Sequence, residues 1–168
     1  MIILFHGSDV VVDSPIARLG RLKVDFGQGF YMTKLRAQAE SWARTIASRR
    51  RNGQAVLNSY EFDYDAARSL AGTRYKVFNA YDTEWLEYVV DCRRGGGMQD
   101  GYDVIEGGVA NDNVIDTVED YENGVITAEQ ALGQLIYKKV NHQICVRSQD
   151  VIDICLKFTG AEVLQEQM

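Results

Sequence analysis

Residues 25–33, with the sequence DFGQGFYMT, decide how the rest of this chain is interpreted. Gly27 and Gly29 allow backbone conformations with positive φ and let a ligand approach the main chain closely. The aromatic and β-branched residues from Gly29 to Thr33 predict a short strand. A glycine loop that leads into an aromatic strand suits a flat ring bound against a wall. The same pattern also fits a bulged hairpin with two core aromatics.

A second stretch, MIILFHGS at residues 1–8, is an apolar run that ends abruptly in polar and small residues. Ile2 to Phe5 predict a central strand, because the run is continuously apolar. His6 then stands at the end of that strand, beside Gly7 and Ser8. Such a histidine is either a turn residue bonded to the backbone or part of a binding site.

These two stretches together resemble the ADP-ribosyltransferase superfamily, in the branch with a His-Tyr-Glu signature that diphtheria toxin shares with the poly(ADP-ribose) polymerases. Proteins of that branch carry His-Gly-Ser on the first strand and a Phe-Gly-x-Gly-Ile-Tyr-like motif on the second. The whole chain is also similar to a bacterial family that is thought to belong to this superfamily. The two motifs cover about a tenth of the chain, and their order and apolar context make the pair more specific than either motif alone.

The resemblance implies a role for each motif residue. His6 is expected to bond a ribose hydroxyl in the adenosine half of NAD, and the backbone of Gly7 to hold the nicotinamide amide with help from the Ser8 hydroxyl. Tyr31 and Trp42, eleven positions apart, are expected to stack on the nicotinamide ring from opposite sides. Stacking and cation–π attraction both favour such a ring. Trp42 also fits a core position on an amphipathic helix.

Gln143 occupies the position where the superfamily has its catalytic glutamate. Nicotinamide cleavage passes through an oxocarbenium-like cation, which a nearby carboxylate stabilises. An amide accepts a hydrogen bond but supplies no charge and no general base. Three interpretations follow: a slow transferase whose acceptor brings its own carboxylate, a binder without catalysis, or a site in which another acid such as Glu106 serves.

Secondary-structure patterns predict an α+β fold. We expect two small, mostly antiparallel sheets splayed around an NAD cleft, with helices packed outside. The 168 residues, 46% of them hydrophobic, fit a single domain over residues 1–168. The net charge of −6 gives no general attraction to a phosphate backbone. The main expected elements are strands at 2–5, 29–33, 55–62, 102–109 and 142–146 and helices at 34–50, 83–92 and 127–139.

Cysteine usage and hydropathy bear on the compartment. Cys92, Cys145 and Cys155 are odd in number and form no Cys-x-x-Cys pair, so neither a disulfide framework nor a zinc site is expected. We therefore expect buried thiols, a cytoplasmic location and no metal. The first residues have no basic region like that of a signal peptide, and no membrane-spanning segment or membrane partner is expected.

The function that the resemblance implies is mono-ADP-ribosyl transfer from NAD to a protein or nucleic-acid acceptor. A bacterial toxin with a small neutralising protein partner is the biological role that it suggests. The alternative is a catalytically weak or inactive module that binds NAD or ADP-ribose on the same fold. A third possibility is an unrelated interaction domain whose motifs match by chance.

Overall fold

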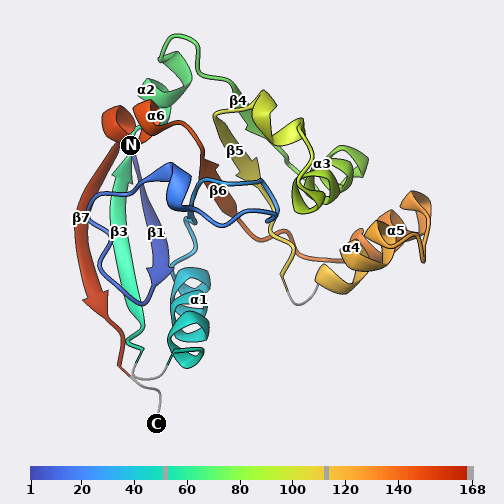
Figure 1. The fold of residues 1–168 in the computed structure, drawn as a ribbon, viewed down its shortest axis with the longest axis horizontal. Coiled ribbons are helices and arrows are strands. Elements are labelled where there is room, and N and C mark those ends of the chain that lie inside the picture. Colours follow the sequence, from blue (N-terminus) through green and yellow to red (C-terminus); the bar gives the residue numbers. More distant parts are fainter. Residues whose placement is uncertain (51–52, 112–113, 166–168) are drawn as a thin grey trace.

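The computed structural model describes residues 1–50, 53–111 and 114–165 (Figure 1). Its strands form two sheets, as expected for the α+β class. The first sheet has the order β1 (Ile2–Ser8), β3 (Val56–Phe62), β7 (Leu156–Val163), and the second β2 (Phe30–Met32), β6 (Gln143–Val146), β5 (Val104–Gly107), β4 (Tyr75–Val77). Every pairing is antiparallel except the one between β4 and β5.

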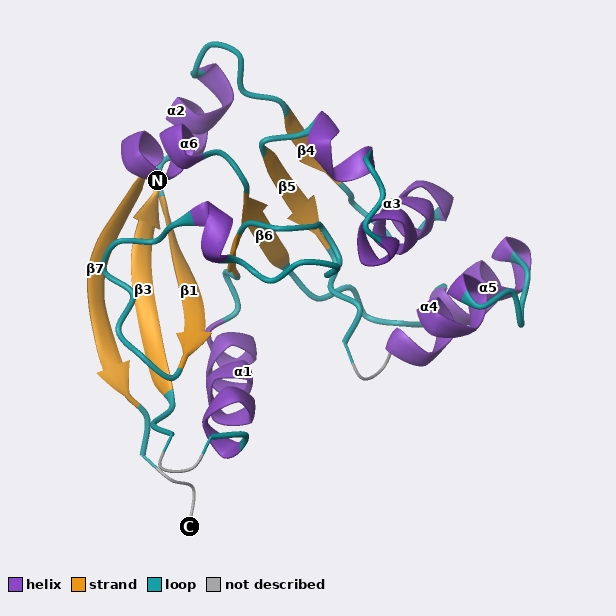
Figure 2. Ribbon diagram, viewed as in Figure 1, coloured by secondary structure: helices purple, strands orange, loops and turns teal. Residues whose placement is uncertain are grey.

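Six α-helices lie around these sheets in the described part of the chain (Figure 2). They are α1 (Arg36–Ser48), α2 (Tyr64–Ser69), α3 (Thr83–Arg94), α4 (Ile115–Glu122), α5 (Ala128–Leu135) and α6 (Gln149–Cys155). Two short 3-10 turns, Ala17–Leu19 and Met98–Gly101, lie in the connecting segments. Over the residues described, no helix combines the length and the apolar character that crossing a membrane requires.

The two sheets share one apolar core. Because side chains alternate along a strand, each strand sends every second residue toward the other sheet. Leu4 and Tyr60 from the first sheet meet Phe30, Ile144 and Val146 from the second in one buried cluster. Phe30 and Tyr60 make an edge-to-face contact between the sheets, with ring centroids 5.5 Å apart. This shared core fixes the position of β1 relative to β2.

Helices cover the outer faces of both sheets. On the first sheet, Ala39 and Ala43 of α1 pack with Leu57 of β3. On the second sheet, the α3 helix packs its buried residues, including Trp85, against Ile105 in a large aromatic cluster. The molecule is therefore layered as α1, first sheet, second sheet and α3.

Local capping signals place most helix starts. Thr127 and Gln130 form a reciprocal capping box at α5, and Asp63, Asp82 and Ser148 each accept a main-chain N–H at the start of their helices. The helix predicted to start at residue 34 starts two residues later.

The Thr33 hydroxyl accepts the N–H of Leu35 at 3.1 Å, so it supports the turn that precedes α1 rather than capping the helix itself.

Candidate functional site

The strands β1 and β2 are edge strands that meet at one residue pair and then separate. Phe5 and Thr33 exchange main-chain hydrogen bonds of 2.8 and 2.9 Å. At the next position the ladder stops, and the carbonyl oxygen of Tyr31 instead accepts a hydrogen bond from His6 Nδ1 at 2.7 Å. A carbonyl only accepts, so Nδ1 carries the proton and Nε2 of the neutral ring is an acceptor. No described residue bonds to that Nε2.

Gly7 has its main-chain groups at the same opening. In an antiparallel ladder the N–H and C=O of alternate residues point to opposite edges. The N–H and C=O of Phe5 point toward β2, and the N–H and C=O of Gly7 therefore point the same way. These two groups of Gly7 bond to none of the described residues. The glycine is also required by packing, since a Cβ there would clash with the main-chain oxygen of Ala39 and lie 2.7 Å from the nitrogen of Ala43.

Ser8 follows at the end of β1 and is buried. Its hydroxyl accepts the N–H of Val10 at 3.3 Å, a local turn contact. Asn58 on β3 holds the same turn, because its Nδ2 donates to the carbonyl of Val10 at 3.1 Å and its Oδ1 accepts from Val12 at 2.8 Å. The histidine, glycine and serine of the first motif are thus neighbours on a firmly held strand end.

Tyr31 holds the glycine loop. Its hydroxyl donates to the carbonyl of Gly27 at 2.5 Å and accepts the N–H of Phe26 at 3.0 Å. Burial raises the pKa of Tyr31 well above its ordinary value, so the phenol is neutral. Gly27 has φ +77°, in the region expected from the sequence. Gly29 does not have a positive φ. A glycine is needed there because a Cβ would lie 2.9 Å from the carbonyl oxygen of Val146 on β6.

The rings of His6 and Tyr31 lie on opposite faces of β2. The His6 ring packs on Phe30, with centroids 4.6 Å apart. Neighbouring residues of a strand point to opposite faces, so Tyr31 points the other way, toward the cluster beneath α3. The two predicted residues are joined through the Tyr31 carbonyl and not through their rings.

Trp42 lies on α1 and is 38% exposed. The guanidinium carbon of Arg21 sits 5.2 Å from its ring centroid and that of Arg49 5.8 Å away. The ring is therefore a cation–π partner rather than a core residue. No described contact joins Trp42 to Tyr31, so the structure does not bring the two predicted stacking residues together.

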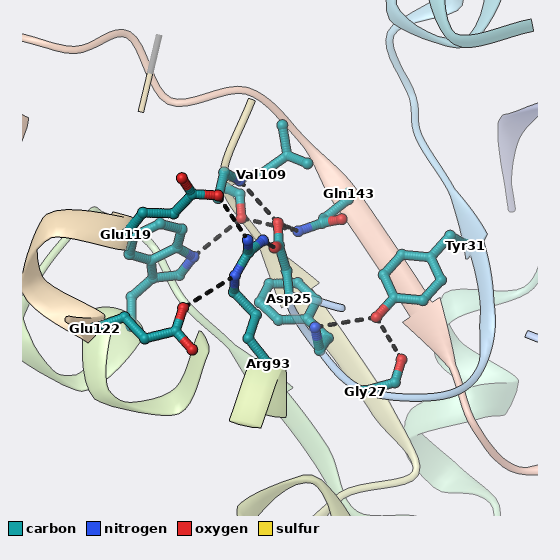
Figure 3. A network of polar contacts seen from close by, with 12 residues as sticks. Asp25, Gly27, Tyr31, Arg93, Val109, Glu119, Glu122 and Gln143 are labelled. Carbon is teal, nitrogen blue, oxygen red and sulfur yellow. Dashed lines mark hydrogen bonds and ion pairs between the residues drawn. The ribbon is translucent and has the colours of Figure 1, made fainter. Parts of the chain in front are cut away.

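Gln143 begins β6, on the same face of the sheet as Cys145 and Tyr31, which is paired with Cys145. Its Nε2 donates to Oδ2 of Asp25 at 3.2 Å and to the carbonyl of Gly108 at 3.1 Å (Figure 3). The same Asp25 oxygen accepts the N–H of Ala110 at 2.8 Å. Sequence reasoning missed this aspartate, although it opens the deciding stretch.

Asp25 is the first member of a buried charge cluster. Its Oδ1 lies 3.3 Å from Nη1 of Arg93. The other two nitrogens of this guanidinium lie near other acids, Nη2 at 3.4 Å from Glu119 and Nε at 3.7 Å from Glu122. Burial raises the pKa of Asp25 above its ordinary value, while the Ala110 N–H and Arg93 oppose that shift. Oδ2 accepts two hydrogen bonds and Oδ1 faces the Arg93 guanidinium, and these three donors favour the carboxylate over the protonated acid.

The side chain of Glu106, the acid that the sequence singled out, does not lie beside that of Gln143. Glu106 pairs with Ile144, one residue along, so its side chain points to the opposite face of the sheet. There its Oε1 accepts from His142 Nε2 at 2.9 Å, and its Oε2 accepts from the Tyr75 hydroxyl at 3.2 Å. The His142 Nδ1 accepts the N–H of Lys34 at 3.1 Å, so both ring nitrogens are used.

This Glu106–His142 pair makes a pH-dependent contribution to stability. Burial is the largest single influence and acts to raise the pKa of Glu106, but hydrogen bonds from His142, Tyr64 and Tyr75 and the electrostatic attraction of His142 together outweigh it. The folded pKa is therefore below the ordinary value. Stabilisation is therefore complete above the unfolded pKa and is lost as pH falls through the lower, folded pKa. We expect the melting temperature to decline on acidification below about pH 4.5. Glu106→Gln should flatten that decline and cost roughly 1–3 kcal/mol at neutral pH.

The control for that measurement is Glu129→Gln, at an exposed position in the first turn of α5. It should leave the acid limb of the melting curve as in the unmodified protein. A Glu106→Gln protein with the same acid limb would show that the pair has no such role.

Two surface grooves of about 370 and 340 Å³ were found, and neither is lined by His6, Tyr31 or Gln143. The first lies between residues 13–16 and α6. The second lies at the ends of β4 and β5 beside Glu106 and His142. Within the described ranges, no three histidine, cysteine or acidic side chains gather as a metal ion would require.

Comparison with known proteins gave one finding. Neither the curated proteins nor the solved structures yielded a match. The sequence matches the family DUF3990, described as a protein of unknown function, over residues 2–158. Because this match spans the two motifs and nearly all of the described fold, the chain belongs to the DUF3990 family.

Proposed function

We propose that this protein is an NAD-dependent mono-ADP-ribosyltransferase of the His-Tyr-Glu type. The observation that carries the proposal is the opening between β1 and β2. There the N–H and C=O of Gly7 and the Nε2 of His6 have no partner among the described residues. A nicotinamide carboxamide offers one acceptor and one donor group, which matches the two main-chain groups of Gly7.

His6 is suited to a ribose hydroxyl. Burial lowers the pKa of His6 below its ordinary value, although the hydrogen bond to Tyr31 acts in the opposite direction. The ring is therefore neutral near pH 7, with its proton held on Nδ1. Nε2 can then accept a hydrogen bond from a hydroxyl group. The bond to the Tyr31 carbonyl fixes the ring orientation in advance, which reduces the entropy lost when a ligand binds.

Trp42 supports the proposal through its cation–π contact. Its ring already holds the planar guanidinium of Arg21. Oxidised nicotinamide is also a planar cation, and in the proposed complex it takes the place of Arg21 on one face of the ring. Tyr31 contributes through its carbonyl, which fixes the His6 ring, and not as a second wall opposite Trp42.

The proposed reaction breaks the bond between the nicotinamide nitrogen and ribose C1′. The bonding electron pair stays with the nicotinamide ring, which loses its positive charge and leaves. The acceptor nucleophile forms a bond to C1′ and releases its proton to water. The ribose is cation-like at the transition state, so nearby negative charge and an acceptor for the 2′-hydroxyl both lower the barrier. Gln143 supplies the acceptor.

The acceptor molecule is proposed to be a protein or nucleic-acid nucleophile in the cytoplasm. A toxin role with a small neutralising protein partner remains part of the proposal through the resemblance alone. The alternative, a module that binds NAD or ADP-ribose without turnover, is favoured by one observation. Gln143 stands where the superfamily has a glutamate, and its amide carries no charge.

The test measures NAD binding and nicotinamide release together. NAD should raise the melting temperature, because a ligand that binds only the folded protein stabilises it. Nicotinamide should accumulate when a cell lysate supplies acceptors. His6→Asn keeps a donor for the Tyr31 carbonyl but lacks an Nε2 acceptor. We expect it to fold normally and to bind NAD about tenfold more weakly, the effect of one lost hydrogen bond.

Tyr137→Ala is the matched control, because this tyrosine is 89% exposed just after α5, far along the chain from both motifs. It should bind NAD as the unmodified protein does. Stabilisation by NAD without any nicotinamide release would favour the binding module over the enzyme. If neither NAD nor ADP-ribose changes the melting temperature, both versions of the proposal are wrong.

A further inference from the structure

We propose that Asp25 is the positioning residue for Gln143 and supplies the negative charge that the glutamine lacks. This inference rests on the proposed function, because it concerns the cation formed when nicotinamide leaves. Asp25 and Gln143 are 118 positions apart in the sequence and are joined by one hydrogen bond of 3.2 Å. Neither the family match nor the sequence motifs assign a role to this aspartate.

The first argument is the orientation of the Gln143 amide. Its nitrogen donates both to Asp25 and to the Gly108 carbonyl, and both of these partners can only accept. The reversed amide would place its oxygen against two acceptors, so the nitrogen is fixed on that side. The amide oxygen has no partner among the described residues, and Figure 3 shows it turned away from Asp25. Asp25 thus prepares an acceptor of known direction.

The second argument is the charge of the cluster. Arg93 is close to three carboxylates, those of Asp25, Glu119 and Glu122. Only one further guanidinium, that of Arg94, approaches this described cluster, at 3.8 Å from Glu122. Three anions and two cations leave one unit of negative charge. The buried carboxylate of this cluster is that of Asp25, whose side chain is 10% exposed. The side chain of Glu119 is 52% exposed, so water screens its charge.

The proposed chemistry therefore divides the usual task of one glutamate between two residues. The Gln143 oxygen accepts a hydrogen bond from the ribose 2′-hydroxyl. The Asp25 carboxylate polarises the amide through its N–H and stabilises the ribose cation electrostatically. Asp25 takes up no proton in this scheme, and both of its oxygens keep their present donors.

The test uses isosteric changes at the two ends of this hydrogen bond. Asp25→Asn removes the charge and should lower kcat for nicotinamide release about a hundredfold, with KM for NAD changing less than threefold. The double variant Asp25→Asn with Gln143→Glu moves the carboxylate to the other side of the same bond. It should recover at least tenfold of the lost rate, a rescue that a merely structural role for Asp25 would not produce.

Gln143→Glu alone gives the opposite test and does not depend on Asp25→Asn folding. Two carboxylates this close cannot both ionise, so one of them takes up a proton and the net charge stays as it was. We expect no gain in kcat at neutral pH. A gain of about a hundredfold would mean that the site lacked a negative charge, and would overturn the inference.

Glu119→Gln is the matched control, because it removes a carboxylate that also contacts Arg93 but is exposed. Its kcat should stay within threefold of the unmodified value. Release of nicotinamide by the unmodified protein together with unchanged kcat in Asp25→Asn would overturn the inference and leave the proposed function standing. An unmodified protein that neither binds NAD nor releases nicotinamide would overturn both.

Discussion

Gly7→Ala is expected to abolish NAD binding and to lower the free energy of unfolding by roughly 1–3 kcal/mol or more. The new methyl group would clash with the main-chain oxygen of Ala39 and lie 2.7 Å from the nitrogen of Ala43. Those atoms belong to the backbone of α1, so no side-chain rotation relieves the clash. Either α1 or β1 must therefore shift. A shift of β1 would also displace the main-chain groups that are proposed to hold the carboxamide. Chemical denaturation and NAD titration measure the two effects.

The same substitution at Gly133 is the matched control. Gly133 lies inside α5, and a Cβ there would meet nothing within 4 Å. Alanine favours a helix interior over glycine, so Gly133→Ala should stabilise the protein by roughly 0.5–1 kcal/mol and leave NAD binding unchanged. A Gly7→Ala protein with normal stability and normal NAD affinity would show that α1 does not constrain β1 at this point.

Trp85→Ala is expected to have the largest effect on stability, a loss of about 3–5 kcal/mol. The side chain is completely buried in the aromatic cluster between the second sheet and α3. Its ring centroid lies 4.6 Å from that of Tyr81. Its indole N–H donates to the Gly108 carbonyl at 3.0 Å, the same oxygen that binds Gln143. The change therefore creates a cavity and removes one of two donors that hold this carbonyl. Urea denaturation measures the loss.

Two variants separate these contributions. Trp85→Phe keeps much of the ring volume but loses the donor to Gly108, and should cost about 1 kcal/mol for the hydrogen bond plus a smaller cavity term. Trp42→Ala changes a partly exposed tryptophan and should cost far less stability than Trp85→Ala. Equal losses in Trp42→Ala and Trp85→Ala would contradict the packing described for α3.

Local patterns predicted the elements of the fold well. Continuous or alternating apolar runs gave the strands at β1, β3 and β6 because burial of one or both faces imposes those periods. The start of α5 followed from Thr127 and Gln130, whose side chains act only on neighbouring backbone. The expected α+β class with two mostly antiparallel sheets is confirmed. The arrangement of these sheets around an NAD cleft remains a proposal.

The candidate site was less predictable. His6 and Gly7 could be singled out because they are adjacent and end an apolar strand. Nothing in the sequence indicates that Tyr31 points away from the His6 ring, because this depends on which face of β2 packs against β1 and His6. Nor does the sequence indicate that Arg21 would cover Trp42. A long-range contact between exposed side chains leaves no periodic signal.

The amino-acid sequence by itself determined the strands, the helix caps and the two glycine motifs, because these depend on residues a few positions apart. Only the tertiary structure decided that β1 and β2 separate after one residue pair, and that Asp25 lies against Gln143. Both features depend on the sheet order, which brings residues 6, 31 and 143 to neighbouring strands. Sheet order reflects the burial of the whole core between the sheets, a sum over many distant contacts that no local pattern contains.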